Sequence, residues 1–264
     1  MIRAAALLAL VLAGGANDPK PAYRSSPERR TEADDRQWGP WLGPFRAKLV
    51  PTMMQDFGER YLYAPANAAL PPPKEGEQRV VFIGDSITDG WDLAQSFPNE
   101  HYINRGIGGQ VTAQMLVRFE QDVVALHPRA VVILGGVNDV TGLLQVESPE
   151  SIVANIEAMA DIASAHGIAV VLCSILPVND YSEAARAVVK ERRPAVLRAI
   201  NARLRAMAMR RGFAYADYDA ALADQRGFMR AELTRDGIHP LDAGYALMVP
   251  IVATAIVSAT SEIK

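Results

Sequence analysis

The sequence has a single cysteine, Cys173, among its 264 residues. One cysteine excludes an internal disulfide framework and a zinc site built on several cysteines. Aromatic side chains are scarce at 7%, and Lys plus Arg (27) nearly balance Asp plus Glu (30), which leaves a net charge of -3. With no basic excess, we expect no nucleic-acid partner. Half of the residues are apolar, which excludes a wholly disordered chain and supplies a sizeable core.

The N-terminus carries a short apolar run. One basic residue, Arg3, precedes apolar residues 4–12, and small residues follow up to Ala16. This order is typical of a signal peptide over residues 1–16 and predicts export to the periplasm or the medium. The run is too short for a bilayer, which needs about 20 apolar residues, so we expect no stable membrane insertion. An Ala-rich N-terminal helix is the alternative interpretation.

Residues 17–77 are expected to form an N-terminal arm and a Pro-rich linker. Charged residues, Pro and Ser dominate the first part, and an aromatic cluster at 38–45 then predicts an anchor on the domain or a lid near a site. Three consecutive prolines at 71–73, followed by polar residues, mark a stiff boundary. The compact domain is therefore predicted over residues 78–264.

Short apolar runs alternate with helical segments in that domain. Strands are expected at 79–83, 101–104, 130–134, 168–175 and 213–217, and helices at 112–126, 149–166, 183–211 (interrupted at Pro194) and 243–257. Apolar strands that alternate with helices predict a parallel sheet covered on both faces, an α/β/α sandwich. In such sheets the ligand lies beyond the carboxyl ends of the strands, so functional residues should follow predicted strands.

Three short segments meet this condition. The sequence GDSIT at 84–88 places Ser86 at a strand-to-helix turn. The sequence NRGIGGQ at 104–110 has three glycines in four residues, which lets backbone N–H groups approach a ligand closely. The segment 135–139 offers the Asn138 amide at the same sheet edge. Taken singly, these segments are equally typical of a helix N-cap, a tight loop and an Asx turn.

A fourth segment, Asp236-Gly237-Ile238-His239-Pro240, precedes the last helix. His239 suits proton transfer near neutral pH, and a carboxylate three residues earlier can hold one ring nitrogen. A Ser nucleophile, a His base and an Asp partner are three roles of one acyl-transfer mechanism. Backbone N–H groups at Ser86 and in the glycine loop, together with the Asn138 amide, would stabilise a tetrahedral oxyanion.

Together the four segments resemble the SGNH (GDSL-type) hydrolases. GDSIT, NRGIGGQ, GVND and DGIHP occur in the order found in that family and extend over most of the chain. The resemblance implies a flavodoxin-like three-layer sandwich with a central parallel sheet, and an esterase that needs no cofactor and no metal. It implies the following roles: Ser86 as nucleophile and first oxyanion donor, Gly109 (or Gly108) as backbone donor, Asn138 as side-chain donor, His239 as base and Asp236 as its partner.

The spacing around these segments is most similar to the branch with platelet-activating-factor acetylhydrolase-like and carbohydrate acetylesterase members. That similarity implies short acyl groups, often acetyl, on a small-molecule or carbohydrate ester. Asp85, Trp91 and Gln110 are the candidate substrate contacts, although Trp91 also suits a buried helix position. The Arg-rich stretch 186–211 is expected to be a solvated helix face.

Three alternatives remain open at this point. An O-acyltransferase would use the same triad with a sugar hydroxyl as acceptor. A metal-dependent phosphoesterase would use Asp85, Asp89, Asp139, Asp236 and His239 as ligands, but the sequence lacks the H-E-x-x-H pattern. A non-catalytic carbohydrate- or lipid-binding module usually lacks one triad member, and here all three are present. The sequence favours a serine ester hydrolase and gives no indication of its oligomeric state.

Overall fold

The computed structural model describes residues 51–141, 144, 147–234 and 236–261. The proposed signal peptide (1–16) and the aromatic cluster at 38–45 lie outside these residues. The described chain forms one five-stranded parallel sheet in the order β2-β1-β3-β4-β5. Its strands are β1 (Val80–Gly84), β2 (Tyr102–Gly106), β3 (Ala130–Leu134), β4 (Ala169–Cys173) and β5 (Ala214–Ala216).

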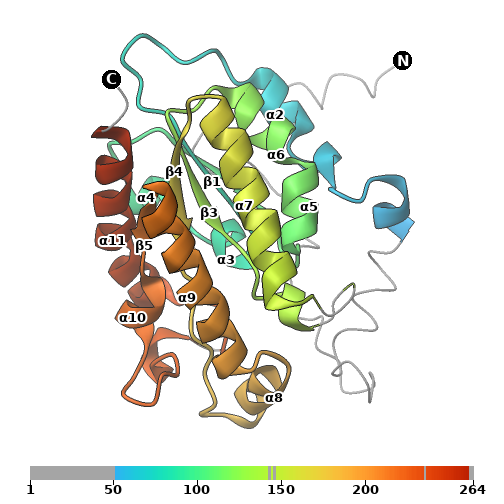
Figure 1. Ribbon diagram of the computed structural model, residues 1–264, viewed down its shortest axis with the longest axis vertical. Helices are drawn as coiled ribbons and strands as arrows, with labels where there is room; N and C mark the ends of the chain where they lie inside the picture. Colours follow the sequence, from blue (N-terminus) through green and yellow to red (C-terminus); the bar gives the residue numbers. More distant parts are fainter. Residues whose placement is uncertain (1–50, 142–143, 145–146, 235, 262–264) are drawn as a thin grey trace, which may run out of the picture.

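Helices cover both faces of the sheet, which confirms the predicted three-layer sandwich (Figure 1). On one face lie α5 (Thr112–Val117), α7 (Pro149–Ala165) and α9 (Pro194–Arg211). On the other lie α3 (Ser86–Asp89), α4 (Leu93–Ser96), α10 (Tyr218–Leu222) and α11 (Asp242–Ser261). The inner strands β1 and β3 are buried along their whole length, as a sheet covered on both faces requires.

Local signals place the ends of the long helices. In α7, the Ser148 hydroxyl accepts a hydrogen bond from the Ser151 N–H, and Pro149 occupies the first helical position. The predicted break at Pro194 separates α8 (Glu183–Glu191) from α9. Gly212 ends α9 with φ of 71°, in the left-handed region that glycine adopts without a steric penalty.

The helix predicted over 112–126 is broken into three pieces. The structure has α5, then α6 (Phe119–Asp122), then the 3-10 turn η4 (Val124–Leu126). The first break falls at Arg118, whose side chain is completely buried and donates to the carbonyl oxygens of Gly84 and Arg105. Apolar spacing alone suggested one helix, but it carries no information about these contacts across the sheet.

The residues ahead of β1 pack on the domain. The 3-10 turn η3 (Arg60–Leu62) and α2 (Ala64–Ala69) lie beside α6, and the Tyr63 side chain is buried. The sequence placed these residues in an arm and linker and began the domain at residue 78. Part of this segment contacts the strand ends, since the Tyr63 hydroxyl bonds the Gly106 carbonyl and Asn67 bonds Arg105.

The final helix, α11, is long enough and apolar enough to cross a membrane by length and composition alone. It packs against β3, β4 and β5 and buries Met248, Val252 and Ile256 in the core. Pro250 lies inside the helix.

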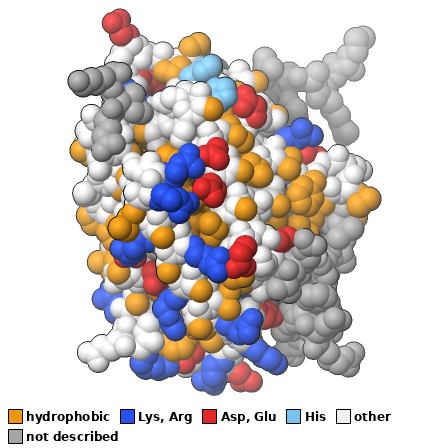
Figure 2. Space-filling model, viewed as in Figure 1, with side chains coloured by type: hydrophobic (Ala, Val, Ile, Leu, Met, Phe, Trp, Pro, Cys, Tyr) orange, Lys and Arg blue, Asp and Glu red, His pale blue; other side chains and the backbone are white. Residues whose placement is uncertain are grey.

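Charged side chains of both signs alternate over the face formed by α7 and α9 (Figure 2). Arg203 pairs with Glu150, and Arg211 contacts Asp161 at 2.5 Å. These exposed pairs agree with a solvated helix face for most of the Arg-rich stretch 186–211. Arg192 is the exception, because its side chain is buried.

Candidate active site

The predicted site segments meet at the carboxyl edge of the sheet. Ser86 follows β1, the glycine loop 107–110 follows β2, and Asn138 follows β3. The chain passes from β1 outward to β2 on one side, and β3 lies on the other side of β1. This reversal of strand order is the point at which open α/β sheets bind their ligands.

Ser86, His239 and Asp236 form a continuous chain of hydrogen bonds. The Ser86 Oγ lies 2.8 Å from His239 Nε2, and His239 Nδ1 lies 2.6 Å from Asp236 Oδ2. All three residues are half-buried, so the hydroxyl is accessible to a substrate. Nε2 can accept the serine proton only while Nδ1 carries its own, and the Asp236 carboxylate favours that tautomer.

A tight turn holds Asp236 beneath the imidazole. Its Oδ1 accepts from the backbone N–H groups of Ile238 (3.0 Å) and His239 (2.9 Å). Burial alone would raise the pKa of Asp236, but the hydrogen bond and charge of His239 and these N–H groups hold it well below its ordinary value. The turn passes through Gly237, where φ is 88° and an added Cβ would lie 2.9 Å from the Ala185 Cβ.

Asp85 shapes the turn that presents Ser86. It is the N-cap of α3, and its Oδ1 accepts from the Ile87 N–H at 3.0 Å. Its Oδ2 is buried without a hydrogen-bond partner. Burial raises the pKa of Asp85 from 3.8 to about 7, against the opposing effects of that N–H and of the charge of His239. Asp85 is 1% exposed, so it lies beneath the turn that carries Ser86 rather than at the surface.

The predicted oxyanion donors Gly109 and Asn138 follow β2 and β3, the two neighbours of β1 in the sheet. Gly109 is half-buried with φ of 81°, whereas Gly108 is buried. Asn138 is held from both ends, since its Nδ2 donates to the Gln110 carbonyl at 3.1 Å and its Oδ1 accepts from Arg192 Nη2 at 3.4 Å.

Trp91 and Gln110 are directed away from the candidate site. Trp91 is 2% exposed and packs in an aromatic cluster with Phe82, Phe97 and Tyr245. Gln110 is 1% exposed, and its side chain forms hydrogen bonds with the Gly58 carbonyl and with Arg118. Both side chains are thus buried among other side chains, while the Gln110 carbonyl accepts a hydrogen bond from Asn138.

Arg192 is the site residue that sequence reasoning missed. It lies between α8 and α9, is 2% exposed, and its charge lowers the pKa of Asp85 as well as bonding Asn138. An arginine inside an Arg-rich stretch looks like its exposed neighbours by composition. The one indication in the sequence was Pro194, because the break that it predicts places Arg192 at a turn between two helices.

Carboxylates near the site are engaged in structural contacts. Asp139 accepts from the Thr112 hydroxyl at 2.5 Å and from the Thr112 N–H at 3.0 Å, which ties the segment after β3 to α5. In the part of the chain that the structure describes, His, Cys, Asp and Glu side chains form no group of three that could hold a metal ion.

A hydroxyl bonded to an imidazole that is bonded to a carboxylate, at the carboxyl edge of a parallel sheet, is the arrangement of serine-dependent acyl-transfer enzymes. The chain belongs to the GDSL-like lipase/acylhydrolase family, whose model matches residues 82–247. Family membership, together with esterases among the structural neighbours, supports a carboxylic ester hydrolase.

Solved structures share this fold. A GDSL-like lipase of Bacteroides thetaiotaomicron is 34% identical, with a TM-score of 0.71 over 77% of this chain and 100% of that chain. An acetyl xylan esterase of Geobacillus stearothermophilus is 21% identical, with a TM-score of 0.55 over 68% of this chain and 94% of that chain. This similarity is one of fold. The lipoprotein YqeF of Bacillus subtilis is 29% identical over 39% of this chain and 50% of its own length.

Proposed function

We propose that the protein hydrolyses carboxylic esters through an acyl-enzyme formed on Ser86. The observation that carries this proposal is the hydrogen-bonded chain from Ser86 through His239 to Asp236. It joins residues from distant parts of the sequence in the geometry that a serine nucleophile requires. Membership of an acylhydrolase family supports the same chemistry.

In the first half of the reaction, His239 Nε2 takes the proton of Ser86 as the Oγ attacks the ester carbonyl carbon. The bond to the alcohol oxygen then breaks, and His239 protonates the leaving alcohol. Asp236 stabilises the imidazolium that forms between these steps. In the second half, His239 activates water, which attacks the acyl carbon and releases the acid and free Ser86.

The backbone N–H groups of Ser86 and Gly109 and the side-chain N–H2 of Asn138 would bind the oxyanion of each tetrahedral intermediate. The greater exposure of Gly109 supports it over Gly108 as the second donor. Loss of one such donor typically costs about 2.7–4 kcal/mol of transition-state stabilisation.

We assign short acyl groups, acetyl first, to this site, on the similarity of its motif spacing to the acetylhydrolase-like branch. A small-molecule or carbohydrate ester would supply them. The test is hydrolysis of p-nitrophenyl acetate, butyrate and octanoate by wild type and Ser86→Ala, with EDTA present. We expect an active wild type, an inactive variant, and rates that fall with chain length. An inert wild type would contradict the hydrolase, and activity only with an added sugar acceptor would indicate a transferase.

Export through residues 1–16 is the accompanying proposal for localisation. The similarity to a bacterial lipoprotein supports an exported protein. Fractionation of cells that express the full chain tests it. We expect mature protein shortened by about 16 residues outside the cytoplasm, whereas full-length protein confined to the cytoplasm would contradict export.

A further inference from the structure

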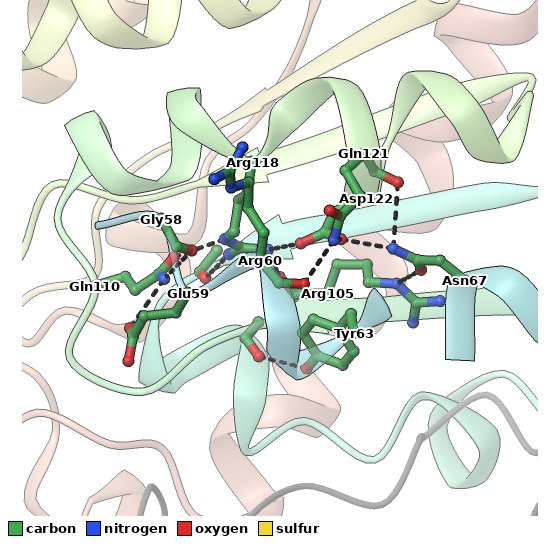
Figure 3. A network of polar contacts seen from close by, with 12 residues as sticks. Gly58, Glu59, Arg60, Tyr63, Asn67, Arg105, Gln110, Arg118, Gln121 and Asp122 are labelled. Carbon is green, nitrogen blue, oxygen red and sulfur yellow. Dashed lines mark hydrogen bonds and ion pairs between the residues drawn. The ribbon is translucent and has the colours of Figure 1, made fainter. Parts of the chain in front are cut away.

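A buried polar network joins the residues ahead of β1 to the glycine loop (Figure 3). These residues precede the part of the chain that matches the family model, which begins at residue 82. Figure 3 shows Glu59 beside Gln110 and Asn67 beside Arg105 and Asp122, while the Tyr63 hydroxyl bonds a backbone carbonyl, that of Gly106.

The contacts converge on Gln110, the last residue of the glycine loop. Its side-chain amide nitrogen donates to the Gly58 carbonyl (3.0 Å) and to Glu59 Oε2 (3.1 Å). Its side-chain oxygen accepts from Arg118 Nε at 2.6 Å. Its backbone N–H closes the loop by donating to the Ile107 carbonyl at 3.3 Å, and its own carbonyl accepts from Asn138. Gln110 thus contacts the segment before β1 through its side chain, and the glycine loop and Asn138 through its backbone.

A second set of contacts fixes the strand ends. The Tyr63 hydroxyl donates to the Gly106 carbonyl at 2.5 Å, immediately before the loop. Arg118 donates to the carbonyls of Gly84 (3.0 Å) and Arg105 (2.7 Å), at the ends of β1 and β2. Asn67 bonds both Arg105 Nε (2.8 Å) and Asp122 Oδ1 (2.7 Å).

The backbone of Glu59 adopts a strained conformation, and its side chain makes a specific buried contact. Its φ is 54°, a left-handed conformation that costs conformational energy in a residue with a Cβ. Glycine would adopt it freely, but glycine has no carboxylate to meet Gln110. The Glu59 side chain is completely buried, so the strain accompanies a specific internal contact.

We propose that Glu59 and Tyr63 are positioning residues that set the oxyanion loop through Gln110 and Gly106. The inference rests on the proposed ester hydrolysis. In this arrangement the segment 58–67 forms a brace, defined by Gly58, Glu59, Tyr63 and Asn67. The brace holds the Gly109 N–H and the Asn138 amide at the distance that the oxyanion of the transition state requires. Such an effect lowers kcat and leaves the ground-state binding of the ester largely unchanged.

The test compares Glu59→Ala, Glu59→Gln, Tyr63→Phe and Arg60→Ala in the full chain. The Arg60 side chain is 53% exposed and pairs with Asp56, so Arg60→Ala is the matched control from the same segment. Two readouts are taken well below each melting temperature: kcat and KM for p-nitrophenyl acetate, and the rate at which a fluorophosphonate labels Ser86. In the labelling step His239 takes the Ser86 proton, the Ser86 Oγ–P bond forms, and the P–F bond breaks with loss of fluoride. The phosphoryl oxygen requires the same donors as the oxyanion.

For Glu59→Ala we expect kcat and the labelling rate to fall about tenfold or more, with KM within about twofold. Glu59→Gln keeps an acceptor for Gln110 and should restore most of the rate. Tyr63→Phe, which loses only a hydroxyl, should lose about threefold or more of kcat. Arg60→Ala should match wild type.

A folded Glu59→Ala with wild-type kcat and a lowered melting temperature would overturn the proposal, because the brace would then be structural only. If Glu59→Ala fails to fold, Tyr63→Phe decides in the same way. An inert wild type would instead refute ester hydrolysis itself. An active wild type, an inactive Ser86→Ala and an unaffected Glu59→Ala would refute the brace alone.

Discussion

The Asn138 amide has one fixed orientation because it bonds at both ends. Its nitrogen donates to Gln110 and its oxygen accepts from Arg192, so the amide is not free to flip. The adjacent guanidinium also places a positive charge near the position assigned to the oxyanion. A donor whose orientation is fixed before the reaction stabilises developing charge without reorganisation.

Replacing Arg192 by Met keeps an apolar stem and removes the donor to Asn138. We expect kcat for p-nitrophenyl acetate to fall about tenfold, the equivalent of about 1.4 kcal/mol, with a smaller change in KM. Arg193→Met is the matched control, since the neighbouring Arg193 is exposed. Equal kcat values for the two variants would contradict a role for Arg192 at Asn138.

Asp236→Asn preserves volume and changes the partner of His239 Nδ1. The amide no longer stabilises the imidazolium and can favour the wrong tautomer, so kcat should fall by about 10³–10⁴. Steady-state kinetics across pH 6–9 measure this loss, and circular dichroism checks that the turn remains folded. A variant within about tenfold of wild type would show that Asp236 contributes little beyond packing.

At the scale of elements, the N-cap residue of α3 is a buried carboxyl group, Asp85, and burial makes its ionisation unfavourable. The pKa of Asp85 is raised to about 7 and that of Asp139 to about 6, in both cases chiefly by burial. An acid with a higher pKa in the folded state binds its proton more tightly there than in the unfolded chain. The free energy of unfolding therefore falls as pH rises from about 4 to 7.

Asp85→Asn removes the titrating group and keeps an acceptor for the Ile87 N–H. Wild type should unfold at a lower urea concentration at pH 8 than at pH 5. The variant should show a smaller difference between the two pH values, and at pH 8 it should be more stable than wild type. Asp236 has a lowered pKa and contributes the opposite dependence only below about pH 4, outside this window. Identical pH dependence in the two proteins would show that Asp85 stays ionised when folded.

Elements whose signals are local were predictable from sequence. The run at 130–134 coincides with β3, and the Gly and Pro residues around 194 and 212 place the ends of α9. The break at Arg118 was not predictable, because it accompanies hydrogen bonds to the ends of β1 and β2. Apolar periodicity reports which face is buried and carries no information about a polar side chain that turns inward.

At the scale of the molecule, we propose that the brace belongs to the folded unit, which would then begin before the boundary at residue 78 that the prolines suggested. A chain over 78–264 would lose Glu59, Tyr63 and Asn67 and leave Asp122 and Arg105 buried with fewer partners. Leaving such buried polar groups without hydrogen-bond partners would lower the free energy of unfolding by about 3 kcal/mol or more. The melting temperature would then fall by about 6–12 °C. Calorimetry of chains 51–264 and 78–264 measures the difference, and equal melting temperatures would place the boundary at residue 78.

The candidate site was largely visible in the sequence because its chemistry lies in four short segments that each follow a strand or precede a helix. Ser86, His239 and Asp236 are joined by hydrogen bonds, and Asn138 bonds the carbonyl of Gln110 in the glycine loop. Arg192 and Glu59 were not foreseen. Their contacts depend on burial and on partners far along the chain.

The distance along the chain between Ser86 and His239 has a consequence for biosynthesis. They are 153 residues apart, so at about 5–20 residues per second a ribosome adds the base about 8–30 seconds after the nucleophile. During that interval the growing chain carries a serine that no imidazole can deprotonate. Under the proposed mechanism, reactivity toward esters therefore arises only once most of the polypeptide has been made.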